Sequence, residues 1–274
     1  MVALLDEAEL RRRLVDEGPY AKLDVVTVTG STNTDLSAAA AAGAPDRTLL
    51  FAEEQQAGRG RMRRTWISPR GYGLHVSAVL RPASVPQGAL GWLPLLAGIA
   101  LAEVVRDACG VPAALKWPND LLLGGGDAWR KGAGILAEAV STADGVAIVV
   151  GIGVNVHHGP GELPTGAGGL PATSLAEQGA DVDRQEFAVR LLTALAAVDD
   201  LWREHAGDVL ASGLLDRYQR LCGTLGQQVR VELGGNDLLG TATGIDADGR
   251  LLVRGADGAG TPVSAGDVVH LRPR

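Results

Sequence analysis

Hydrophobic positions in the first part of the chain repeat at strand spacing and at helical spacing in turn. Short apolar runs predict strands over residues 22–28, 48–53, 73–80, 131–138 and 146–156. An apolar strand over 114–123 breaks at Pro118 and Asn119 and then resumes. In residues 73–80 every second position is apolar, so we expect one buried face there. Helical spacing predicts helices over residues 6–17, from about 31 to 43, and over 89–109.

Polar residues at two of the predicted helix starts have the spacing of helix caps. Ser31 or Thr32 is expected to cap the alanine-rich second helix, and Thr32 with Asp35 resembles a capping box. Asp183 and Glu186 repeat this spacing at the start of an amphipathic helix over 183–204. A further helix is expected from about residue 208 to 221.

After Gly226 the pattern changes to short strands joined by Gly and Asp turns. The expected strands cover residues 228–233, 238–245, 251–254, 261–264 and 267–271. Strands this short and evenly spaced are typical of a small antiparallel barrel. We therefore expect two domains, one over residues 1–224 and one over residues 225–274.

Composition and charge narrow the class of protein. The chain has 274 residues, of which 46% are hydrophobic and 21% charged, as in ordinary globular proteins. Its two cysteines predict no disulfide framework and no zinc site, which favours a cytoplasmic protein with free thiols. The start of the chain has no apolar signal core, and the apolar segment 90–105 is interpreted as too short to span a bilayer. About twenty residues precede the first strand, too few for a helix-turn-helix domain.

The segment from Glu53 to Trp66 carries the most distinctive chemistry. Four arginines fall within six residues, although the formal net charge of the whole chain is -7. Glycines between the first of them let the backbone bend, and guanidinium groups fit carboxylate and phosphate oxygens. The segment is interpreted as a loop that closes over an anionic ligand. A solvated surface loop is the alternative that a charge run alone would favour.

Four other short segments add polar or glycine-rich positions at strand ends. They are Gly30-Ser31-Thr32-Asn33, Lys116-Trp117-Pro118-Asn119-Asp120, Lys131 with residues 134–138, and Gly151-Ile152-Gly153-Val154-Asn155. Glycines within strands indicate close approach of a ligand or of another backbone. The pair His157 and His158 lacks a nearby third ligand, so we interpret it as a loop position and not a metal site.

Together with Gln55-Gln56-Ala57-Gly58-Arg59-Gly60-Arg61 and Trp66, these segments resemble the biotin–protein ligases, in the order found in that family. The resemblance implies an α+β fold with a mixed, largely antiparallel sheet packed by helices, followed by an SH3-like barrel. It also implies a ligase-only chain without an N-terminal DNA-binding domain. Arg63, where the family usually has glycine, and Gly132, where a branched residue is common, are departures that concern loop closure.

The resemblance implies a reaction in two steps and a role for each matching residue. Biotin and ATP would form biotinyl-5′-AMP with Mg²⁺ as cofactor, and a lysine of a biotin carboxyl carrier domain would then accept the biotin. The implied catalytic residues are Arg59, Arg61, Lys131 and Asp120. Biotin would contact Ser31, Thr32, Asn33, Gln55, Gly58, Arg59, Arg61, Lys131 and Gly134. The nucleotide would contact Trp66, Lys116, Asn119, Asp120 and Asn155, and Asp120 would also bind Mg²⁺.

Three alternatives remain open at this point. A lipoate– or octanoate–protein ligase shares the fold, but its Arg-Arg-x-x-Gly-Gly-Gly signature is absent. A nucleic-acid-binding module is disfavoured by the acidic net charge and by the lack of interleaved aromatic residues in the barrel. An inactive scaffold is disfavoured by the intact lysine, arginines and Asp120. We expect no nucleic-acid or membrane partner, and a monomer or weak homodimer.

Overall fold

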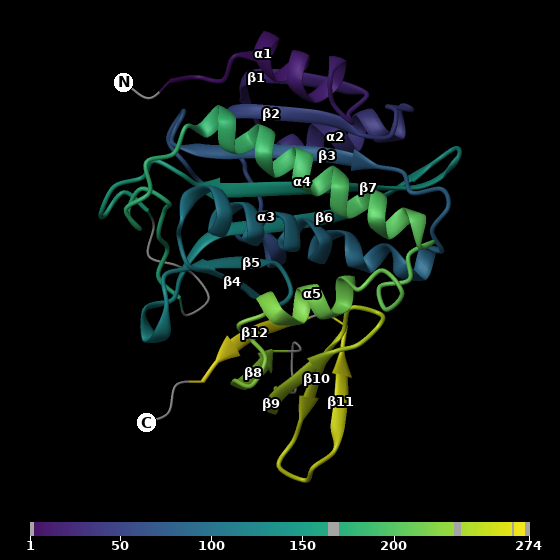
Figure 1. The fold of residues 1–274 in the computed structure, drawn as a ribbon, viewed down its shortest axis with the longest axis vertical. Coiled ribbons are helices and arrows are strands. Elements are labelled where there is room, and N and C mark those ends of the chain that lie inside the picture. The colour runs from purple at the N-terminus through teal and green to yellow at the C-terminus, as the bar shows by residue number, and fades with distance from the viewer. Residues whose placement is uncertain (1–2, 164–169, 233–236, 265, 272–274) are drawn as a thin grey trace.

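The computed structural model describes residues 3–163, 170–232, 237–264 and 266–271, which form two β-sheets and the helices around them (Figure 1). The larger sheet has seven strands in the order β1-β2-β3-β7-β6-β5-β4. Only β1 and β2 pair in parallel, and the other neighbours pair antiparallel. The predicted mixed, largely antiparallel sheet is therefore confirmed. Its strands are β1 (Lys22–Thr29), β2 (Thr48–Gln55), β3 (Gly73–Leu80), β4 (Ala113–Lys116), β5 (Asp120–Leu123), β6 (Arg130–Thr142) and β7 (Gly145–Asn155).

Helices cover both faces of this sheet. The long helices α3 (Leu93–Cys109) and α4 (Arg184–Glu204) cross one face, with α5 (Leu214–Leu221) beside them (Figure 1). Helix α2 (Thr32–Ala41) packs on the opposite face. The alternation along β2 shows the two layers, because Leu49 and Phe51 join the large core under α3 and α4, whereas Leu50 joins a small core with α2.

The structure corrects two sequence expectations, one about the burial of a strand and one about the length of an apolar helix. Strand β3 was expected to bury one face, but all eight of its residues are buried because α2 and the segments around it cover the second face. The helical stretch Gln87–Cys109, a 3₁₀ turn (Gln87–Trp92) followed by α3, is also long and apolar enough to cross a membrane by length and composition. Within this fold, 61% of its most apolar part is buried, as expected for a core helix.

The helix ends follow the sequence closely, with three exceptions. The first helix is α1 (Glu7–Arg11), which continues as a π-helical turn (Arg12–Asp16). Ser31 occupies the N-cap of α2 by backbone geometry, but its side chain makes no capping hydrogen bond, and Asp35 accepts one from Thr29 instead of completing a capping box. Asp183 caps α4 as predicted by accepting from the backbone of Gln185 and Glu186. Helix α5 begins at Leu214, later than the expected start near residue 208.

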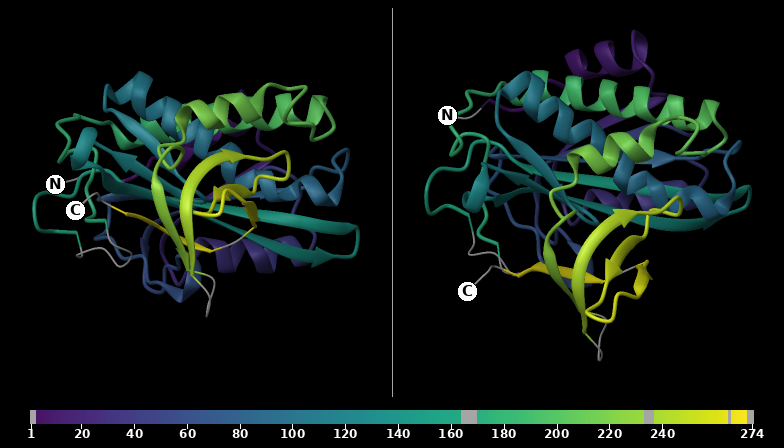
Figure 2. Two further views of the ribbon diagram at one scale, coloured as in Figure 1. Left: turned by 90° about the horizontal axis from the view of Figure 1, so that it is seen from below. Right: turned by 60° about the horizontal axis from the view of Figure 1, so that its bottom comes forward.

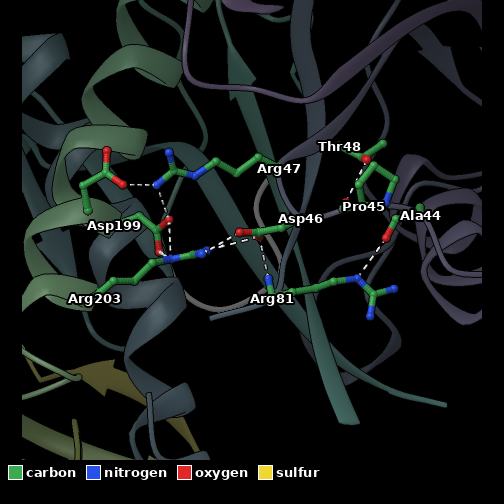
Figure 3. A network of polar contacts seen from close by, with 9 residues as sticks. Ala44, Pro45, Asp46, Arg47, Thr48, Arg81, Asp199 and Arg203 are labelled. Atoms are coloured by element: carbon green, nitrogen blue, oxygen red, sulfur yellow. Dashed lines mark hydrogen bonds and ion pairs between the residues drawn. The ribbon is translucent and has the colours of Figure 1, made fainter. Parts of the chain in front are cut away.

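The segment between α2 and β2 is joined to α4 by a polar network (Figure 3). Asp199 of α4 lies between two guanidinium groups, 2.8 Å from Arg47 and 2.9 Å from Arg203. Arg203 also binds Asp46, which accepts the backbone N–H of Arg81 as well. Burial raises the pKa of Asp46, but these hydrogen bonds outweigh it and leave that pKa below its usual value.

The second sheet is antiparallel and has five strands in the order β11-β10-β9-β8-β12. They are β8 (Gln228–Glu232), β9 (Leu238–Ile245), β10 (Leu251–Arg254), β11 (Gly260–Val263) and β12 (Asp267–His270), close to the predicted strands. This small SH3-like unit lies below the β4 and α5 side of the large sheet (Figures 1 and 2). Two buried tryptophans hold it there, since Trp92 Nε1 donates to the carbonyl of Ala247 at 2.7 Å and Trp117 Nε1 to that of Gly249 at 3.0 Å.

Candidate active site

A cavity of about 440 Å³ opens on the α2 face of the large sheet. Its walls come from the start of α2, the arginine-rich segment, and strands β6 and β7. Among its described lining residues, four cationic side chains (Arg59, Arg61, Arg64 and Lys131) accompany one carboxylate, Asp120. The cavity thus concentrates positive charge in a protein whose net charge is -7, which is the arrangement expected for an anionic ligand.

One end of the cavity is a hydrogen-bonding network at the start of α2. Gln55 Oε1, at the end of β2, accepts the backbone N–H of Thr32 at 2.9 Å and lies 3.2 Å from Thr32 Oγ1. Behind them, Ser77 Oγ of β3 lies 2.7 Å from both Thr32 Oγ1 and Asn33 Oδ1. Ser31 lines the same end. Ser77 could not be singled out from the sequence, because nothing in its own segment distinguishes it from other strand serines.

The network continues to the arginine-rich segment through Glu138 of β6. Asn33 Nδ2 donates to the carbonyl of Leu136 at 3.1 Å and to Glu138 Oε2 at 2.8 Å. The guanidinium of Arg59 lies 3.4 Å from Glu138 Oε1 and donates to Thr34 Oγ1 at 2.8 Å. Glu138 is therefore a second residue of the site that the sequence did not single out, although it lies in the segment 134–138 that follows Lys131.

The other end of the cavity is basic. Lys131 Nζ forms an ion pair with Asp120 Oδ1 at 2.6 Å and lies 5.9 Å from the centre of the Trp66 ring. Arg61 approaches Asn119 Oδ1 at 3.5 Å, and Asn119 Nδ2 donates to the carbonyl of Ile135 at 3.0 Å. These residues meet because β5 and β6 pair in antiparallel register, with Asp120 opposite Gly134.

Glycines of β6 and β7 form the floor of the cavity, and the groups that lie close to them are two side chains, not the ligand or backbone that the sequence predicted. A Cβ on Gly153 would lie 2.8 Å from the Trp66 indole, and one on Gly151 would lie 2.1 Å from Asn33 Oδ1. Both contacts are too close, so glycine is required for the tryptophan and the asparagine to lie on these strands. On Gly134, a Cβ would lie 3.3 Å from the same indole.

The arginine-rich segment folds back on itself. Arg59 and Thr65 form an isolated antiparallel bridge, and Trp66 N donates to the carbonyl of Gly58 at 2.8 Å. Gly58 cannot be replaced at this turn, because a Cβ would lie 2.4 Å from the Trp66 carbonyl. Closure of the segment over a ligand stays a prediction.

Most of the predicted site residues line this one cavity. They are Ser31, Thr32, Asn33, Gln55, Arg59, Arg61, Trp66, Asn119, Asp120, Lys131, Gly134 and Asn155. Gly58 and Lys116 are not among the lining residues: Gly58 supports the turn, and Lys116 is buried at the end of β4. Asn155 lines the cavity with its amide donating to the carbonyl of Thr173 at 2.9 Å. The individual ligand contacts of all these residues stay predictions.

Beside the cavity, a buried histidine cluster lies under the end of the arginine-rich segment. Ser68 Oγ is 2.9 Å from His158 Nε2, and His158 is fully buried with Tyr72 packed edge-on against it. Burial lowers the pKa of His158, and it lowers the pKa of nearby His75 to about 4. His158 lies in the irregular segment after β7, as expected for a loop position, but its side chain is buried. Within the described residues there is no group of three or more His, Cys, Asp or Glu side chains suited to a metal ion.

Comparison with known proteins places this arrangement in a family. The profile described as Biotin/lipoate A/B protein ligase family matches residues 25–155, and the Biotin protein ligase C terminal domain profile matches residues 224–271. The biotin–[acetyl-CoA-carboxylase] ligase of Mycobacterium tuberculosis is 44% identical over 275 residues, covering 98% of this chain and 96% of that protein. The ligase of the same name from Paracoccus denitrificans is 36% identical and covers 84% of this chain and 93% of its own length.

A solved structure agrees with these matches. The biotin protein ligase from Aquifex aeolicus in complex with biotin and ATP superposes with a TM-score of 0.75 at 27% identity, covering 93% of this chain and all of that one. The relatives and this structure do not favour the lipoate ligase alternative. The chain belongs to the biotin/lipoate A/B protein ligase family, and within it to the biotin protein ligases.

Proposed function

We propose that this protein is an ATP-dependent biotin–[acetyl-CoA-carboxylase] ligase. The observation that carries the proposal is the two-ended cavity: the uncharged hydrogen-bonding groups of Thr32 and Gln55 lie at one end, and the Lys131–Asp120 ion pair lies at the other, in a lining that has four cationic side chains and one carboxylate among its described residues. Biotin has this same division, with a neutral ureido head and an anionic carboxylate. The named relatives and the Aquifex structure with biotin and ATP support the same assignment.

In the first step, a carboxylate oxygen of biotin attacks the α-phosphorus of ATP. The P–O bond to pyrophosphate breaks, and biotinyl-5′-AMP forms. The carboxylate is already ionised at neutral pH, so the enzyme must mainly position two anions and offset their charge. Arg59, Arg61 and Lys131 supply that charge. The ureido head forms hydrogen bonds with Ser31, Thr32 and Gln55, in a pocket completed by Asn33, the turn at Gly58 and the floor at Gly134.

In the second step, the amine of a carrier lysine attacks the acyl carbon of the mixed anhydride. The bond to AMP breaks, an amide forms, and the amine loses a proton. Asp120 is the one carboxylate among the described lining residues, and its proposed roles are to accept this proton or to bind Mg²⁺. Trp66, Lys116, Asn119, Asp120 and Asn155 form the proposed nucleotide site. The acceptor is a biotin carboxyl carrier domain of a carboxylase.

Magnesium fits this site as an ion carried by the nucleotide. Mg²⁺ uses one or two carboxylates together with substrate phosphates, and it keeps several waters. Asp120 supplies one carboxylate, 2.6 Å from Lys131, and no three-residue group for a metal occurs among the described residues. When bound, the ion would neutralise phosphate charge. We further propose a cytoplasmic enzyme, monomeric or weakly dimeric, with a domain boundary at residues 224/225 and no nucleic-acid or membrane partner.

The test is biotin-dependent ATP–pyrophosphate exchange, with lipoate and octanoate as parallel acids. Exchange measures the first step and needs no carrier. We expect exchange with biotin alone. Exchange with lipoate or octanoate in place of biotin would refute the substrate, and no exchange with any acid, from protein shown to be folded, would refute the reaction.

A further inference from the structure

Ser77 is a buried hydroxyl that no assigned role explains. It lies in β3 and is completely buried, directly behind the cavity wall and opposite Gly151 in the register of β3 and β7. Its Oγ is 2.7 Å from both Thr32 Oγ1 and Asn33 Oδ1. A serine hydroxyl has one hydrogen, so it can donate to only one of these two oxygens.

The orientation of Asn33 decides which oxygen receives that hydrogen. Asn33 Nδ2 faces the carbonyl of Leu136 at 3.1 Å and Glu138 Oε2 at 2.8 Å, and these two groups can only accept. Its Oδ1 must therefore face Ser77, where Gly151 leaves room for it. Because a side-chain amide oxygen cannot donate, Ser77 must donate to Asn33 Oδ1.

This assignment fixes the hydroxyl of Thr32. Since the Ser77 hydrogen is used, the 2.7 Å contact between the two hydroxyls requires Thr32 to donate to Ser77. No hydrogen then lies between Thr32 Oγ1 and Gln55 Oε1, which are 3.2 Å apart, and Gln55 Oε1 receives only the Thr32 backbone N–H. Two oxygens of cavity-lining residues are left as hydrogen-bond acceptors.

We propose that Asn33 and Ser77 are positioning residues that make Thr32 Oγ1 an acceptor, and so select an acid whose head carries N–H donors. This inference rests on the proposed function and deepens it. A urea supplies such donors to Thr32 and Gln55. A dithiolane or a hydrocarbon chain supplies none and would leave an acceptor position unfilled on each of the two oxygens, which is the kind of mismatch that polar sites reject most strongly.

The experiment measures biotin affinity by titration calorimetry, without ATP, for the full-length protein and its variants. In Ser77→Ala, the Thr32 hydroxyl is free to turn toward Gln55 and becomes a donor, so we expect the Kd for biotin to rise by about 10- to 100-fold. Thr48→Val is the matched control, because it removes another buried hydroxyl, bonded to the Pro45 carbonyl and outside the cavity lining. Its Kd should equal that of the wild type.

A double-mutant cycle separates positioning from a general structural role. If Ser77 acts through Thr32, adding Ser77→Ala to Thr32→Val should change the Kd by less than about 3-fold further. Losses that multiply would overturn the proposal, as would a Ser77→Ala protein that binds biotin like the wild type. If Ser77→Ala does not fold, Ser77→Cys, with a poor donor of similar shape, serves in the same cycle. Failure of the wild type itself to bind biotin would instead refute the proposed function.

Discussion

At the scale of single residues, Lys131 and Asp120 form the ion pair at the basic end of the cavity. The lysine side chain is 27% exposed, so we expect the Lys131→Ala protein to fold. We expect Lys131→Ala to lower the rate of biotin-dependent exchange by about 100- to 1,000-fold, as for loss of one group that stabilises developing charge. Lys22→Ala, which removes an exposed ion pair with Asp24, is the control and should retain full exchange. Near-normal exchange by folded Lys131→Ala would contradict the assignment.

His75 gives the protein a pH-dependent stability. Burial lowers its pKa to about 4, with Arg184 and His158 as further unfavourable charges, whereas an unfolded histidine titrates near 6.5. Between these values the unfolded chain binds more protons than the folded one, so stability is lost as the pH falls from about 6.5 to about 4.

The measurement is urea unfolding at a series of pH values in this window. His75→Leu should reduce the slope of the unfolding free energy against pH in this window, by the amount that corresponds to about one bound proton. Tyr72→Phe, a change beside the same cluster with no group that titrates in the window, should keep the wild-type slope. Equal slopes for His75→Leu and the wild type would show that His75 does not titrate as inferred.

At the scale of elements, α4 is joined to the start of β2 through Asp199 (Figure 3). Its side chain is 1% exposed and lies between Arg47 and Arg203, which are 15% and 18% exposed. Removing the shared carboxylate leaves two guanidinium groups without their common partner, so we expect Asp199→Ala to destabilise the protein by about 2–4 kcal/mol. The neighbouring Asp200 also binds Arg47 but is half exposed, so Asp200→Ala should cost less than about 1 kcal/mol.

Chemical denaturation of the two alanine variants tests this difference. Unfolding free energies are compared with that of the wild type, and biotin-dependent exchange is measured in parallel. Both variants should keep their exchange activity below the unfolding transition, because neither aspartate lines the cavity. Equal destabilisation by both substitutions would indicate that burial of Asp199 contributes nothing.

The order of elements could be predicted from the sequence because periodicity reports local structure. The start of α5 could not, since Asp208 accepts the N–H groups of Leu210 and Ala211 in a separate turn before Gly213 adopts a positive φ of 70°. Burial of both faces of β3 depends on where α2 packs, and the packing position of α2 cannot be predicted from the sequence of either segment alone. Ser77 joins the site for a similar reason, because strand pairing places it opposite Gly151.

At the scale of the whole molecule, the small sheet contributes to the site. Gly266, just before β12, lines the cavity, so the position of this unit shapes part of its wall. The unit is held by the turn between β9 and β10, where the carbonyls of Ala247 and Gly249 receive the indole N–H groups of Trp92 and Trp117. Thr224 Oγ1, which accepts a hydrogen bond from Trp117 N at 3.0 Å, also lies 3.1 Å from His270 Nε2 of β12.

Trp117→Phe tests this attachment. The ring would remain in the core, but the Gly249 carbonyl would lose its donor, so we expect a loss of stability of about 1–3 kcal/mol by urea denaturation. Trp129→Phe, on the connection between β5 and β6 and only partly buried, should change stability by less than about 0.5 kcal/mol. Because the small unit reaches the cavity, Trp117→Phe should also raise the KM for ATP while leaving the Kd for biotin unchanged. If stability falls but the KM for ATP does not change, Trp117 holds the two sheets together without affecting the site.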